Sequence, residues 1–376
     1  MSRLMLAFSR EWIKGLAQSM GIILFTLIAL QLARLGPKLL QLGLTPRDFA
    51  WILPRLIPAF LVLALPVSGL YALLSMLGRW KSHGEWLALQ SSGAGWRALK
   101  APILIWHGFL AILVGLMAFQ VGPLSLLTIQ EKLQTRTQAV FWETLRSGQA
   151  VELGKGFWLK AREVRDEHEV GGVILHRETS TESTGVNSLM NGSLDLWAKS
   201  ACLTSSTTHA GILELNGGGW VAGGDLQHSA RFDVMRLDMA HFGGRSALPA
   251  FFFPWELKTQ TELAEELSST GLEPEMRRNL LAEFHRRIML CLLPWVFGLF
   301  ALALFSRFPV LSPATALTIT VLGAGAANLL ERLGFSLVQR AALPVWLGGY
   351  LPLIAMSVLA LYLILTGKRT GRKVRP

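Results

Sequence analysis

The sequence is poor in charged residues and in the residues of disulfides and nucleotide binding. Of 376 residues, 16% are charged and 51% are hydrophobic, whereas soluble globular chains have about 25% charged residues. The two cysteines are Cys202, in a polar stretch, and Cys291, in an apolar one, so no disulfide framework is expected. No Walker A sequence occurs, because Gly367-Lys368 lacks the preceding glycine and the following Ser or Thr. The composition is that of a membrane protein, and the chain cannot be its own ATPase.

Residues that could form an active site or a metal site are also scarce. His168, in DEHEV, has no second histidine at ligand spacing, and a charged surface turn explains it better than a metal site. His285, in EFHRR, stands at the edge of an apolar run, where interfacial anchoring is the simpler interpretation. No GxSxG sequence accompanies Ser91-Ser92. We therefore predict neither a catalytic site nor a bound metal in this chain.

Six apolar runs approach the length of about 20 residues that crosses a bilayer. The second contains Pro54, Pro58 and Pro66, so a kink is expected there. The fold class that follows is an α-helical polytopic membrane protein with a 3+3 arrangement of spans. The predicted spans are 16–35, 52–77, 101–123, 288–305, 313–333 and 346–366.

The distribution of basic residues predicts the orientation. If both termini and the loops 78–100 and 306–312 face the cytoplasm, these segments contain 13 Lys and Arg against Glu11 and Glu85. The positive-inside rule favours this arrangement. The formal net charge of +11 then reflects membrane orientation and not nucleic-acid binding, and the basic C-terminal tail is expected to be a cytoplasmic anchor.

A polar block between the third and fourth spans is predicted to lie outside the membrane and to be mostly β. It begins with the helical stretch Gln130–Arg146 and continues as short β-like runs broken by glycine, which is typical of a sandwich, a jelly roll or an open barrel. Gly217-Gly218-Gly219 and Gly223-Gly224 are predicted turns. The β-like runs are Val151–Val164, Gly172–Arg177, Leu194–Leu203, Gly211–Leu215 and Arg231–Leu237. The predicted domains are spans 1–3 (1–127), a jelly-roll-like domain (128–255), a helical connector (256–287) and spans 4–6 with the tail (288–376).

The loop between the second and third spans is the most informative segment. It contains one acid, Glu85, followed by Trp86, Leu87 and Leu89 and then by Ser91-Ser92-Gly93, which ends the pattern. This is typical of a short amphipathic helix at the membrane surface. We predict a docking helix within about 80–93 that presents a carboxylate and an apolar face to a separate motor protein.

Basic residues also occur where the general charge bias does not predict them. Arg34 and Lys38 follow the first span, and Arg55 opens the second. They could snorkel to the interface or pair with Asp48. The alternative is a group of cations in the outer leaflet that binds the phosphates of an anionic lipid.

The whole pattern resembles the LptF/LptG permeases, the membrane subunits of the lipopolysaccharide exporter. HGEWLALQSSG (83–93) is similar to the family's acid-led cytoplasmic signature, with Trp86 in place of the usual Leu. Leu65-Pro66 with Leu77-Gly78-Arg79 and EFHRR (283–287) also match, whereas LPVWLGGYLP (343–352) interrupts the family's usual W-L-P.

The resemblance implies a half-transporter in the bacterial inner membrane, with cytoplasmic termini and a periplasmic β domain. It implies docking of a cytoplasmic ABC ATPase dimer through Glu85, Trp86, Leu87, Leu89 and Gly93, with ATP and Mg held by that partner and no cofactor in this chain. A paralogous or identical permease subunit, a periplasmic bridge and a membrane-anchored adaptor are the other implied partners. Lipopolysaccharide would meet Arg34 and Lys38 in the first span, and Arg55 is a further candidate.

Two other classes remain open at this point. The chain could be a permease of another lipid, lipoprotein or efflux ABC system, which would also work with a separate ATPase. Such subunits usually have four spans, with the external domain after the first. A membrane-anchored enzyme or sensor would need clustered catalytic residues or a cytoplasmic output domain, and the sequence suggests neither.

Overall fold

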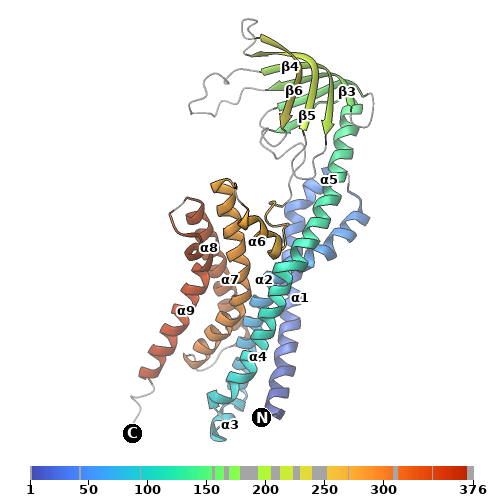
Figure 1. Cartoon of the computed structure of the whole chain (residues 1–376). Helices are drawn as coiled ribbons and strands as arrows, with labels where there is room; N and C mark the ends of the chain where they lie inside the picture. Colours follow the sequence, from blue (N-terminus) through green and yellow to red (C-terminus); the bar gives the residue numbers. More distant parts are fainter. Residues whose placement is uncertain are drawn as a thin grey trace. The chain divides into compact units, whose positions relative to one another are not determined.

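The computed structural model divides the chain into two compact units, which are described separately (Figure 1). The helical unit comprises Met1–Pro37, Pro46–Thr128 and Phe253–Pro376, and the sheet unit comprises Lys38–Thr45 and Ile129–Phe252. The structure describes residues 2–41, 44–93, 95–154, 157–164, 169–177, 194–204, 212–222, 229–238, 252–269, 271–307, 312–340 and 342–370.

Among the described residues, six helices are long and apolar enough to cross a membrane, which confirms the predicted number of spans. The helices extend beyond the apolar runs, because polar residues at either end continue the same backbone hydrogen bonding. The spans are Leu4–Arg34, Pro46–Ser82, Leu99–Arg136, Pro274–Arg307, Pro313–Gln339 and Val345–Thr366. They belong to α1 (Ser2–Gln41), α2 (Pro46–Ser82), α4 with η1 and α5 (Gly95–Leu116, Met117–Val121, Gly122–Arg146), α7 (Pro274–Arg307), α8 (Pro313–Gln339) and α9 (Val345–Thr370).

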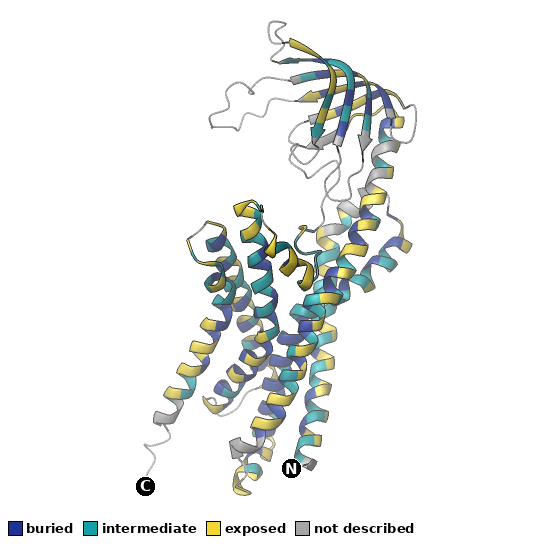
Figure 2. Ribbon diagram, viewed as in Figure 1, coloured by how far each residue is buried: buried dark blue, intermediate teal, exposed yellow. Residues whose placement is uncertain are grey.

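Helices α2 and α7 form the centre of the helical unit. About two thirds of the residues in the most apolar stretch of each of these helices are buried. The corresponding share is 6% for α1 and 22% for α8. Figure 2 shows the buried residues concentrated on these inner helices. The exposed apolar side chains of α1 and α8, such as Phe25 and Val321, are chemically suited to lipid tails, which are as apolar as they are.

The third span contains one turn of π-helix, η1, between α4 and α5. Pro123 follows this turn and has no backbone N–H, so a regular α-helical ladder would be interrupted here in any case. Gly122 is required at the junction, because a Cβ there would lie 2.7 Å from the carbonyl oxygen of Met117.

The described strands of the sheet unit form an antiparallel sheet in which they follow one another in chain order. This order is a meander, and the jelly-roll detail of the prediction is not established by it. One face forms an apolar layer that includes Leu159, Leu175, Leu196 and Leu215. The strands are β1 (Val151–Gly154), β2 (Phe157–Val164), β3 (Glu169–Arg177), β4 (Leu194–Thr204), β5 (Ile212–Ala222) and β6 (Ser229–Asp238).

The prediction that Gly217–Gly219 forms a turn is wrong, because these glycines lie inside β5. Gly217 has a φ of +62°, and a Cβ on Gly218 would lie 2.0 Å from the carbonyl oxygen of Trp197. The glycines therefore allow a local irregularity and the close approach of β4, both recognised uses of glycine within a strand. The predicted turn at Gly223-Gly224 and the residue His168 lie outside the described residues.

The chain returns to the helical unit through a short segment and helix α6 (Gln260–Ser268). Thr259 caps α6: its hydroxyl accepts from the Glu262 amide, and the Glu262 carboxylate accepts from the Thr259 amide. Gly271, with a φ of +110°, separates α6 from α7. α7 then continues without a break from Pro274 into the fourth span, so residues 274–287 of the predicted connector belong to the membrane helix.

Candidate functional site

The predicted docking helix is observed as α3 (Glu85–Ser91), and it begins and ends at glycines with positive φ. Gly84 has a φ of +78° and Gly93 one of +75°, a conformation in which glycine carries no steric penalty. Residues 80–82 of the predicted segment belong to α2. In Figure 1, α3 lies at the same end of the helical unit as the N-terminus and the last turns of α9.

Trp86 attaches α3 to the helical core. Its indole is 7% exposed and meets the ring of Phe305 in α7 edge to face, with centroids 5.1 Å apart and an interplanar angle of 73°. Leu89 also packs against the core. The apolar side of α3 is therefore turned largely inward, which differs from the expectation that it faces a partner as a whole.

The outward side of α3 carries Glu85 and Leu87. Glu85 is exposed, and Leu87 is 69% exposed. Gly93 is exposed at the end of the helix. Of the five predicted docking residues, Glu85, Leu87 and Gly93 are thus accessible, while Trp86 and Leu89 support the helix from within.

Lys81, at the end of α2, completes this attachment. Its ammonium group donates a 2.7 Å hydrogen bond to the carbonyl oxygen of Phe305 and lies 4.4 Å from the centroid of the Phe305 ring. The last carbonyls of a helix have no partner within the helix, so a lysine from another helix satisfies one of them. Phe305 therefore joins α2, α3 and α7 at one point, which sequence inspection did not identify.

A second attachment links α1 to α2 at the same end. The Glu11 carboxylate accepts a 3.2 Å hydrogen bond from the Trp80 indole and forms a 3.7 Å ion pair with Arg79. Phe8 meets the Trp80 ring edge to face at 6.0 Å. These contacts fix the end of α2 from which α3 departs.

The three predicted lipid-binding cations lie on α1 and α2. Arg34 is exposed on α1. Lys38 lies in α1 but belongs to the sheet unit, and its side chain is outside the described residues. Arg55 donates a 3.0 Å hydrogen bond to the carbonyl oxygen of Trp51 and stacks over the Trp51 ring at 3.7 Å.

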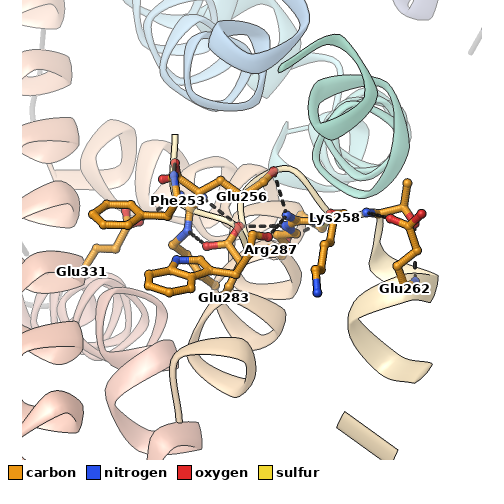
Figure 3. A network of polar contacts seen from close by, with 11 residues as sticks. Phe253, Glu256, Lys258, Glu262, Glu283, Arg287 and Glu331 are labelled. Atoms are coloured by element: carbon orange, nitrogen blue, oxygen red, sulfur yellow. Dashed lines mark hydrogen bonds and ion pairs between the residues drawn. The ribbon is translucent and has the colours of Figure 1, made fainter. Parts of the chain in front are cut away.

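A buried charge cluster lies in the N-terminal part of α7 (Figure 3). The Glu283 carboxylate, 4% exposed, accepts two hydrogen bonds from Arg286 at 2.7 and 3.0 Å and one from Arg287 at 2.8 Å. Arg286 also reaches Glu331 of α8 at 3.4 Å. Two cations around one carboxylate offset the large cost of burying its charge.

The sequence contained a signal for this cluster. In EFHRR, the acid is followed three and four residues later by arginines, which is the spacing that places side chains on one helix face. His285, between them, points to another neighbour: its Nδ1 lies 3.3 Å from the hydroxyl of Tyr350 in α9.

The glycine pair that interrupts the motif LPVWLGGYLP has a packing role. A Cβ on Gly348 would lie 2.8 Å from the carbonyl oxygen of Gly334 in α8, and a Cβ on Gly349 would lie 3.0 Å from Cβ of His285 in α7. The two glycines thus allow α9 to cross both neighbours closely, the usual function of small residues between membrane helices.

These features define a polytopic helical membrane protein with an inserted β domain and a short helix anchored at one end of its bundle. The family model for the lipopolysaccharide export system permease LptF/LptG matches residues 8–366. The chain therefore belongs to the LptF/LptG family, as the sequence motifs indicated, and it is a transport subunit of the permease type. A search of curated proteins found no match.

Proposed function

We propose that the chain is one permease subunit of an ABC-type exporter that extracts lipopolysaccharide from the outer leaflet of the inner membrane. A separate cytoplasmic ATPase dimer, which binds ATP and Mg, drives the process. A second permease subunit, paralogous or identical, completes the membrane part. The β domain faces the periplasm and passes the lipid to a periplasmic bridge of similar fold, with a membrane-anchored adaptor as a further partner.

The exposed side of α3 is the observation that carries this proposal. Glu85 and Leu87 project from a helix that Trp86, Phe305 and Lys81 fix to α2 and α7. This arrangement is expected of a docking element. The helix that carries the exposed acid and the exposed leucine is already fixed, so binding costs little conformational entropy. Within the loop 78–100 Glu85 is the only acid, so it offers a single charge-specific contact to a basic groove.

The substrate explains why a motor and an apolar conduit are needed. Each methylene of an acyl chain that leaves the bilayer for water costs about 0.8 kcal/mol. A lipid with several acyl chains exposes tens of methylenes, so spontaneous release is negligible. The apolar face of the sheet, with Leu159, Leu175, Leu196 and Leu215, is the surface on which those chains would travel if the sheet opened.

The cations at the outer end of the first two helices are proposed to bind the phosphates of the lipid. Arg34 is exposed and therefore available, Lys38 follows it by one helical turn, and the Arg55 guanidinium lies over the Trp51 ring. Guanidinium groups bind phosphate through paired hydrogen bonds. Charge reversal of Arg34 and Lys38 should therefore impair lipid binding while assembly is retained.

Co-purification tests the motor. The full-length chain would be tagged, extracted in detergent from its host and compared with the variant Glu85→Lys. Glu275→Lys is the matched control, because Glu275 is also an exposed acid but lies in the first turn of α7. We expect a small ATPase and a second permease subunit with the wild type and the control, and loss of the ATPase alone with Glu85→Lys. A wild-type chain that purifies without any nucleotide-binding protein would contradict the proposal.

A further inference from the structure

Arg287 is only 2% exposed, and each of its three side-chain nitrogens donates a hydrogen bond within the protein. Its Nε donates to Glu283 at 2.8 Å. One terminal nitrogen donates to the carbonyl oxygen of Lys258 at 2.7 Å, and the other to those of Trp255 and Glu256 at 3.1 and 3.3 Å. Figure 3 shows the guanidinium lying between α7 and the segment that carries these carbonyls.

That segment, Phe253–Thr259, is here called the strap. It is the part of the helical unit that follows directly on the sheet unit, which ends at Phe252. The strap is ordered internally: the rings of Phe253 and Trp255 stack at 4.9 Å, and the Glu256 carboxylate accepts a 3.0 Å hydrogen bond from the Phe253 amide. Its C-terminal end caps α6 through Thr259, and Lys258 pairs with Glu266 of α6.

Three strap carbonyls thus depend on one arginine. A lysine could neutralise Glu283, but its compact ammonium group cannot reproduce a planar fork that reaches three carbonyls. Arg286 already neutralises Glu283, so charge balance alone does not explain why an arginine stands at position 287. The additional contacts serve the strap and not the helix bundle.

The same helix carries the attachment of α3 at its other end. α7 runs as one helix, with Pro294 inside it, from Arg287 to Phe305, where Trp86 and Lys81 meet it. Eighteen residues of α-helix span about 27 Å. A displacement of α3 therefore acts on a buried, continuous helix whose far end is clamped to the strap.

We propose that Arg287 is a positioning residue that fixes the strap to α7, so that movement of the docking helix α3 is transmitted through α7 to the strap and to the β domain that it joins. This inference rests on the proposed function, because it concerns how ATP hydrolysis by a docked partner reaches the lipid-carrying domain. Arg287 contacts neither partner nor lipid in this account. Its role is to make the strap and α7 move as one body.

The test uses the full-length chain with its co-purified partners in proteoliposomes that contain rough lipopolysaccharide. Arg287→Lys is compared with the wild type and with Arg277→Lys, an exposed arginine of the same helix. A photo-crosslinking phenylalanine analogue replaces Phe232, which packs against the apolar layer of the sheet. ATP hydrolysis, ATP-dependent crosslinking to lipopolysaccharide and hydrogen–deuterium exchange of the strap amides are then measured.

We expect the Phe253 and Glu256 amides to exchange faster in Arg287→Lys, while residues 290–305 stay protected and ATP hydrolysis continues. The equilibrium between the fixed and the released strap should shift by about tenfold or more towards release for each charge-assisted hydrogen bond that is lost. ATP-dependent crosslinking should therefore fall. Arg277→Lys should match the wild type in all three measurements. Faster strap exchange with unchanged crosslinking would overturn the inference.

A second variant avoids the buried arginine, in case Arg287→Lys does not fold. Insertion of Gly-Ser between Phe252 and Phe253 keeps the clamp but lengthens the link to the sheet. We expect wild-type strap exchange and reduced crosslinking, and wild-type crosslinking would overturn the inference. Absence of ATP-dependent crosslinking in the unmodified chain would instead contradict the proposed function, while the exchange data would still report whether Arg287 holds the strap.

Discussion

Trp86 and Phe305 meet edge to face with their ring centroids 5.1 Å apart, although they are 219 positions apart in the sequence. Aromatic pairs in this geometry contribute about 0.5–1.5 kcal/mol beyond the area they bury. The contact places the short helix α3, which could not be stable in isolation at seven residues, on the end of the central helix α7. The proposed docking surface therefore depends on an interior contact.

Truncation of Trp86 should disable docking even though the side chain is not accessible. Trp86→Ala is expected to destabilise the α3 region by about 3 kcal/mol, since it empties a buried aromatic site. The amount of co-purified ATPase should fall with it. Trp86→Phe keeps a ring against Phe305 and should retain most of the ATPase, so equal losses in the two variants would contradict the anchoring role.

Leu87 should show the opposite behaviour. Because it is 69% exposed, Leu87→Asp should change the free energy of unfolding by no more than about 0.5 kcal/mol. The same change should sharply reduce ATPase association, since a charged side chain would replace an apolar contact at the proposed interface. Thermal unfolding in detergent and co-purification together measure the two effects, and retained association would remove Leu87 from the docking surface.

The crossing of α8 and α9 should not tolerate a methyl group at Gly334. A Cβ there would lie 2.1 Å from the carbonyl oxygen of Gly348, so the helices would have to separate. We expect Gly334→Ala to destabilise the helical unit by about 1–3 kcal/mol. Gly325→Ala on the same helix is the control, because its Cβ would meet no atom within 4 Å. Thermal unfolding that is equal in both variants would contradict this packing.

The strap should lose stability as the pH rises. Burial raises the pKa of Glu256 above its ordinary value of 4.5; nearby Glu283 acts in the same direction, and the Phe253 amide, Arg286 and Arg287 oppose it. As the pH rises, Glu256 therefore loses its proton in the unfolded chain before it does so in the folded protein. The free energy of unfolding falls between the unfolded pKa of 4.5 and the higher folded pKa. Glu256→Gln should match the wild type at low pH and be the more stable protein from about pH 4.5 upward. Thermal unfolding of both proteins over a range of pH measures this difference. Stability profiles of the wild type and Glu256→Gln that run parallel would contradict a raised pKa of Glu256.

The helical architecture could be predicted from the sequence because membrane spans are encoded locally. An apolar run such as 313–333 must satisfy its backbone hydrogen bonds within one helix, and the structure has a helix there. The short β-like runs were also local signals, and each overlaps a described strand. The run 151–164 contains two strands, however, and β5 continues past Leu215 to Ala222. Gly217–Gly219 was misassigned because glycine serves turns and strand interiors alike, and only the neighbouring Trp197 carbonyl decides between them.

The candidate site was only partly predictable. The α3 segment was found through its single acid and its terminal glycine, but the direction of its apolar side depends on Phe305, which is distant in the sequence. The spacing of Glu283 and Arg287 is that of a shared helix face, a signal that was not used in the sequence-based prediction. It could not indicate that Arg287 would reach three carbonyls of the strap, since those contacts exist only once the chain has returned from the sheet.

The most direct test of the central claim is ATP-driven extraction of lipopolysaccharide. The chain and its co-purified partners would be reconstituted in proteoliposomes with labelled rough lipopolysaccharide, and lipid released to an added periplasmic acceptor would be followed with ATP, without ATP and with Glu85→Lys. We expect ATP-dependent release by the wild type, little release by the variant, and none when a labelled phospholipid or a lipoprotein replaces the lipopolysaccharide. ATP hydrolysis by an intact complex that releases only lipoprotein or phospholipid would contradict it.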